Sequence, residues 1–153
     1  MKKLFISKLL ILGLLFAAGA TCTKAQGLSE GTIEADVPFA FIVGKKTFPA
    51  GKYTFKRADD TNPEVLGISD NSGRRTIFFR ADNAEANEYP SQTKLVFDKI
   101  GDQYFLSEIW ASDTNVGYRL PKTNAEKSLE GGDIKAELHS ILAKLFRRTK
   151  TSK

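Results

Sequence analysis

The sequence predicts an all-β protein, a small antiparallel β-sandwich or barrel of about eight strands followed by a C-terminal amphipathic helix. The first observation is a series of short runs rich in β-branched and aromatic residues, which extends over residues 32–121. The second is the spacing of the turns, because Gly, Pro, Asn and Asp clusters separate these runs about every eight to twelve residues. The third is the lack of alternating strand-like and helix-like segments, which a parallel sheet would need.

Four segments are expected: a signal peptide in 1–25, a β-domain in 26–121, a C-terminal helical segment in 122–148 and a basic tail in 149–153. Lys2 and Lys3 precede an apolar run over 9–18, and small residues follow, which is the layout of a secretory signal peptide. Cleavage is expected after Ala25, with Ala20 as the alternative. The mature protein is therefore expected in the periplasm or outside the cell.

Export changes how charge and cysteine content are interpreted. Four lysines leave with residues 1–25, and five further basic residues lie within 144–153, so the segment between them is acidic overall. This balance does not support a nucleic-acid partner. Cleavage after Ala25 also removes Cys22, which excludes disulfides and thiolate catalysis from the mature chain.

The first half of the domain contains several short strand candidates. They are 32–37, 39–43, 46–48, 52–57, 65–69 and 75–80. Residues 32–37 alternate in polarity, so Ile33, Ala35 and Val37 are expected to face inward. Residues 81–92 lack periodicity and are expected to be a loop, either a solvated connection or a binding loop.

The central hairpin is expected to turn at Gly101-Asp102, because Gly accepts the positive φ of a two-residue turn. The expected cross-strand pairs are Lys99 with Tyr104, Asp98 with Phe105, Phe97 with Leu106, Val96 with Ser107 and Leu95 with Glu108. One face would then carry Leu95, Phe97, Tyr104, Leu106 and Trp110, together with Lys99 and Glu108. The opposite face would carry Val96, Ile100, Phe105 and Ile109.

The C-terminal part is expected to hold a last strand at 116–120 and two helices. Thr123 and Glu126 have the spacing of a capping box, which predicts a short helix over 124–130. A second helix would begin at Asp133, with an apolar stripe at helical spacing. The stripe residues are Ile134, Leu138, Ile141, Leu142 and Leu145. This helix is expected either to pack on the β-domain or to lie on an anionic membrane.

Glu108 is the most informative candidate for a ligand contact. A carboxylate on a partly apolar face needs a partner, and Arg119 or Lys99 could provide one. Trp110, Tyr104 and Tyr118 could add an aromatic platform for a sugar or lipid, with Tyr53 beside them. The alternatives are a structural ion pair and core aromatics.

The sequence contains no catalytic, cofactor-binding or metal-binding motif that we can assign. A Gly-rich phosphate loop is absent, and His139 is the single histidine. Asp98 and Glu108 could serve carboxylate-dependent hydrolysis, but the expected hairpin register places them on opposite faces.

Two stretches together resemble a family of small exported β-rich bacterial proteins of unknown function, of the acidobacterial type. They are 37–53, VPFAFIVGKKTFPAGKY, and 94–110, KLVFDKIGDQYFLSEIW. The resemblance covers most of 32–121 and implies export and a β-fold. It brings no catalytic residues.

The leading hypothesis is an exported non-enzymatic β-protein that binds a small molecule or belongs to the cell envelope. One alternative is a lipocalin-like carrier of an apolar ligand. The other is the carboxylate-dependent hydrolase. The sequence leaves the ligand and the oligomeric state open.

Overall fold

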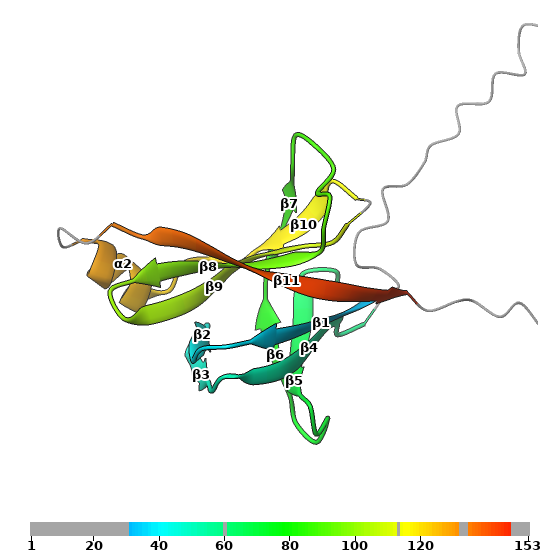
Figure 1. Cartoon of the computed structure of the whole chain (residues 1–153), viewed down its shortest axis with the longest axis horizontal. Helices are drawn as coiled ribbons and strands as arrows, with labels where there is room; N and C mark the ends of the chain where they lie inside the picture. Colours follow the sequence, from blue (N-terminus) through cyan, green and yellow to red (C-terminus); the bar gives the residue numbers. More distant parts are fainter. Residues whose placement is uncertain (1–30, 60, 113, 132–134, 148–153) are drawn as a thin grey trace, which may run out of the picture.

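The computed structural model describes residues 31–59, 61–112, 114–131 and 135–147 (Figure 1). Within these ranges the chain forms eleven strands and one short helix. The strands are β1 (Gly31–Val37), β2 (Phe41–Val43), β3 (Lys46–Phe48), β4 (Gly51–Arg57), β5 (Val65–Asp70), β6 (Thr76–Arg80), β7 (Asp82–Glu85), β8 (Lys94–Ile100), β9 (Gln103–Trp110), β10 (Val116–Arg119) and β11 (Glu137–Arg147), and the helix is α2 (Asn124–Glu130). The expected signal peptide, Cys22, Asp133 and the basic tail lie outside the described residues.

The eleven strands of the described part form one sheet, which curls into a half-barrel (Figure 1). The strand order is β3-β2-β9-β8-β11-β1-β4-β5-β6, and β10 and β7 extend from β9. The all-β prediction is confirmed. The sheet has eleven strands instead of about eight, partly because β7 forms inside the expected loop 81–92.

The expected second C-terminal helix is wrong, because residues 137–147 form strand β11. Residues 137–142 pair with β8, and residues 143–147 pair with β1. β11 therefore bridges two groups of strands, β1-β4-β5-β6 and β3-β2-β9-β8 with β10 and β7, and it crosses the molecule between them in Figure 1.

The apolar pattern of this segment fits a strand as well as a helix, and pairing decides between them. Ile141, Ala143 and Leu145 recur every second residue and pack against the core as partly buried side chains. A helix would leave the facing edges of β1 and β8 without backbone partners, which is costly for buried edges. As a strand, the segment leaves three large apolar side chains exposed on the other face. They are Leu138, Leu142 and Phe146.

The central hairpin follows the expected register only near its turn. Lys99 pairs with Tyr104, Asp98 with Phe105 and Phe97 with Leu106, as the turn chemistry predicts. A β-bulge between Val96 and Phe97 then shifts the ladder, so Val96 faces Glu108 and Leu95 faces Ile109. The two expected pairs beyond the bulge are wrong. Because a one-residue shift exchanges the faces of a strand, Ile109 points into the core while Glu108 and Trp110 point outward.

The core fills the inner face of the half-barrel and joins both groups of strands. Phe41 is fully buried, and its ring centroid lies 5.3 Å from Phe48, 5.1 Å from Tyr53 and 5.5 Å from Phe97. Burying an aromatic side chain of this size contributes about 1.5–3 kcal/mol. These rings therefore hold β2, β3, β4 and β8 against one another.

The expected short helix is confirmed as α2. The N–H of Glu126 donates to the Thr123 hydroxyl at 3.2 Å, and the N–H of Thr123 donates to the Glu126 carboxylate at 2.6 Å. This capping box satisfies two donors at the first turn of the helix. No helix in the described ranges is long and apolar enough to span a bilayer.

Candidate functional site

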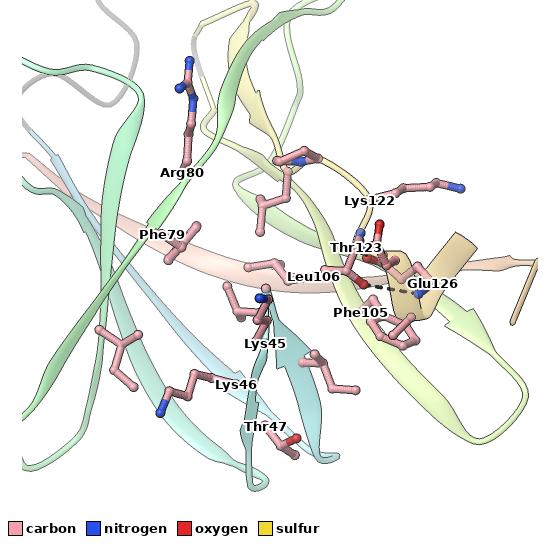
Figure 2. Close-up of a pocket in the computed structure, with 18 of the residues that line it drawn as sticks. Lys45, Lys46, Thr47, Phe79, Arg80, Phe105, Leu106, Lys122, Thr123 and Glu126 are labelled. Carbon is pink, nitrogen blue, oxygen red and sulfur yellow. Dashed lines mark hydrogen bonds between the residues drawn. The ribbon is translucent and has the colours of Figure 1, made fainter. Parts of the chain in front are cut away.

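The half-barrel stays open between its two ends, and a cleft of about 860 Å³ lies there (Figure 2). Its lining comes from the β2–β3 hairpin at 42–47, the edge strand β6 at 77–80, β9 at 105–106 and the connection at 120–126. β3 and β6 are the first and last strands of the sheet order. The cleft is therefore the gap that an incomplete barrel leaves.

The walls of the cleft are apolar. Ile77 and Phe79 are partly buried and pack against the core from the inner face of β6. Leu106 and Leu120 are buried on the opposite side, and Val43 closes the end at the β2–β3 hairpin. Such a surface favours the apolar part of a ligand.

The rim of the cleft carries four basic residues, which are Lys45, Lys46, Arg80 and Lys122. Arg80 pairs with Glu64 at 2.6 Å. Lys122 pairs with Glu130 and with Asp98 at 3.7 Å, and its hydrogen bond to Glu130 raises the pKa of the ammonium group.

Lys45 and Lys46 differ from the other two cations. Lys45 is exposed in the turn between β2 and β3, and Lys46 is exposed at the start of β3. Neither forms an ion pair within 4.0 Å with a residue that the structure describes. Glu126 is the one acidic residue among the described lining residues, and its carboxylate is held in the capping box. The cleft therefore favours a ligand with negative charge.

Three of the five candidate residues from the sequence do come together, on the outer face of the sheet. Arg119 Nε donates to Glu108 Oε1 at 3.0 Å, and Trp110 Nε1 donates to Glu108 Oε2 at 2.8 Å. The expected pairing with Arg119 is thus present, while Lys99 lies 4.0 Å from Glu137. Both carboxylate oxygens of Glu108 have partners, as in a structural ion pair.

Trp110 has little surface left for a ligand. It pairs with Gly117 on β10, and a Cβ atom added at Gly117 would lie 2.3 Å from the Trp110 ring. The ring therefore lies flat across the glycine, and it packs with Val96 and Ala84 as a buried side chain. The expected face shared by Trp110, Glu108 and Tyr104 is wrong because the bulge turns the first two outward.

Tyr104 and Tyr118 lie apart from that cluster. The Tyr104 ring stacks on Phe39 with centroids 3.9 Å apart, and the His139 ring approaches it edge-on at 5.6 Å. Tyr118 is a core residue, and burial raises the pKa of its hydroxyl. Tyr53 is also buried and donates to the carbonyl oxygen of Pro49 at 2.7 Å. The aromatic residues do not form one platform.

The bulge also changes the relation of Asp98 and Glu108. Val96 faces Glu108, so Asp98 lies on the same outer face, two residues further along β8. The expectation of opposite faces is wrong. Asp98 pairs with Lys122, which lies close to the start of α2, and Glu108 pairs with Arg119. Among the described residues, no group of three His, Cys, Asp or Glu side chains could hold a metal ion.

The cleft was not anticipated from the sequence. Its lining comes from four segments that are up to about eighty positions apart, and only the curled sheet brings them together. The available signal was the pair of adjacent lysines, Lys45 in the expected turn and Lys46 at the start of the expected strand 46–48. In comparisons with protein-family models, curated proteins and solved structures, no match to this chain was found.

Proposed function

We propose that this chain is an exported, non-enzymatic binding protein that holds an anionic ligand with an apolar part in the cleft of its half-barrel. The observation that supports this most is the combination of apolar walls with two exposed lysines at the rim, which have no ion-pair partner among the described residues. The walls would remove the apolar part from water, and Lys45 and Lys46 would meet the charged group.

This proposal combines the binding hypothesis with the carrier alternative from the sequence. A lipocalin holds its ligand inside a closed barrel, whereas the cleft here is open along one side. The hydrolase alternative has less support, because the carboxylates of Glu108 and Asp98 each have a cationic partner. Membrane contact through a C-terminal amphipathic helix has no support, since β11 occupies that segment.

Calorimetric titration with dodecanoate, below its critical micelle concentration, tests the binding proposal. We expect dodecanoate to bind and dodecyltrimethylammonium, which has the same chain and the opposite charge, to bind much more weakly. The double variant Lys45→Glu with Lys46→Glu should weaken dodecanoate binding by about tenfold or more, because two attractive charges become repulsive.

The matched control is Lys52→Glu with Lys56→Glu on β4, since both lysines are exposed and lie outside the cleft lining. This control should bind dodecanoate as the unchanged protein does. Equal binding of the two detergents, or equal losses in the two double variants, would contradict a charged rim at the cleft.

Export is tested separately, by sequencing the N-terminus of protein recovered from its own host. The expected mature chain begins at Gln26, because the small residues before it fit a signal peptidase site. An acylated Cys22 at the N-terminus would instead place the protein on a lipid anchor.

A further inference from the structure

Strand β6 ends the sheet, and one of its sides has no partner strand among the described residues. Its other side pairs with β5, from Val65 opposite Arg80 to Ser69 opposite Thr76. The N–H of Ala81 continues this ladder and donates to the carbonyl oxygen of Glu64 at 2.8 Å. Hydrogen-bonded and non-hydrogen-bonded pairs alternate along an antiparallel ladder.

This alternation identifies which backbone groups face the open edge. Counting back from Ala81, Phe79 and Ile77 direct their N–H and C=O groups to β5. The N–H and C=O groups of Thr76, Phe78 and Arg80 point away from β5, toward the cleft that β6 borders. An edge of this kind is a template for one more strand.

The side chains of β6 leave room for such a strand on both faces. Ile77 and Phe79 point inward and line the cleft, so alternate side chains of an added strand would enter the same apolar space. Phe78 points to the outer face and is 59% exposed. An added strand would place a side chain beside this ring and cover part of it.

The charges around the edge indicate what kind of strand would fit there. Arg74 and Arg75 are exposed just before β6, whereas Arg80 at its end already pairs with Glu64. Lys45 and Lys46 stand across the cleft. A second copy of the chain would bring the same cations to the contact, which disfavours self-pairing. An acidic strand would meet complementary charge.

We infer that the ligand of the cleft is an extended, acidic peptide segment that adds to the free edge of β6 as a further antiparallel or parallel strand. The peptide backbone forms hydrogen bonds with the N–H and C=O groups of Thr76, Phe78 and Arg80, and the inward side chains of the peptide fill the cleft. This inference rests on the proposed function, because it names the occupant of the same cleft.

The test uses a synthetic capped peptide in which Val and Thr alternate between terminal Glu residues, titrated calorimetrically into the full mature chain. Phe78→Pro removes the one outward N–H at the centre of the edge without removing a bond to β5, and proline is tolerated at such edge positions. We expect binding to weaken by about tenfold, as for one lost hydrogen bond of about 1.4 kcal/mol.

Phe78→Val is the matched control, because it removes the ring but keeps the N–H. It should lose the contact of the ring but bind the peptide about tenfold more tightly than the Pro variant, and circular dichroism of both variants should report an intact sheet. A peptide N-methylated at alternate residues, and one with Lys in place of Glu, should both fail to bind.

Three outcomes would overturn strand addition. Equal peptide binding by the Pro and Val variants would show that the edge backbone is not used. Binding of dodecanoate without any binding of the acidic peptide would leave the proposed function standing and remove the peptide. Failure of both ligands to bind would remove both proposals together.

Discussion

The two groups of strands in this half-barrel face each other at two junctions. One junction is closed by a shared strand and the other is open. At one of them β11 bridges the groups, pairing with β8 along its first half and with β1 along its second half. At the other, β3 and β6 remain apart on either side of the cleft. The bridging strand has eleven residues, whereas β3 has three and β6 has five.

The difference separates the part of the sheet that we expect to hold the fold together from the part that we propose binds a ligand. The bridged junction buries backbone groups and apolar side chains from both groups, so the folding of the sheet depends on it. The open junction leaves backbone groups of β6 and the cleft lining available to a ligand. Exposed charged residues such as Arg75 and Lys46 lie around it, and charge at an open edge disfavours edge-to-edge pairing.

The largest effect is expected from removing the bridge. A chain that ends at Gly131 lacks β11, so the facing edges of β1 and β8 lose their partners and Ile141 and Leu145 no longer cover the core. Thermal melting followed by circular dichroism should show no cooperative transition at the melting temperature of the full chain. An unchanged melting temperature would mean that β11 does not hold the two groups together.

The bridged and the open junction can be compared directly by making the same substitution at one phenylalanine in each. Phe97 on β8 is fully buried, so Phe97→Ala should lower the free energy of unfolding by about 3–5 kcal/mol. Phe78 at the open edge is 59% exposed, and Phe78→Ala should cost less than about 1 kcal/mol. Urea denaturation measures both. Similar costs would show that the β6 edge is covered in solution.

A smaller effect distinguishes a strand from a helix within β11. Leu145 faces the core, and Leu142 faces outward with 64% exposure. Leu145→Ala should therefore cost about 1–2 kcal/mol and Leu142→Ala less than about 0.5 kcal/mol. In the amphipathic helix expected from the sequence both leucines belong to one buried stripe, so equal costs for the two variants would favour that helix.

Local chemistry made some of this fold predictable. Gly101 set the turn of the central hairpin and the register as far as Phe97 and Leu106, and Thr123 with Glu126 marked the start of α2. Beyond Phe97 the register depends on a bulge that no Gly or Pro marks. The face of Glu108 and Trp110 was therefore predicted incorrectly, although the pairing of Glu108 with Arg119 was anticipated.

Long-range pairing explains the remaining errors. The segment around Ile141 has apolar residues at both helical and strand spacing, and only the free edges of β1 and β8 favour the strand. The cleft likewise depends on how far the sheet curls. Its residues, such as Lys46 and Phe79, carry no motif that would join them in the sequence.

Amide hydrogen exchange, followed by NMR on the free protein, tests the contrast between the two junctions most directly. Residues 94–99 of β8 have paired strands on both sides, so all of their amides should be protected, that of Phe97 included. In β6 the amides of Ile77 and Phe79 should be protected, while the amide of Phe78 should exchange rapidly. A Phe78 amide as strongly protected as that of Phe97 would contradict an open edge at β6.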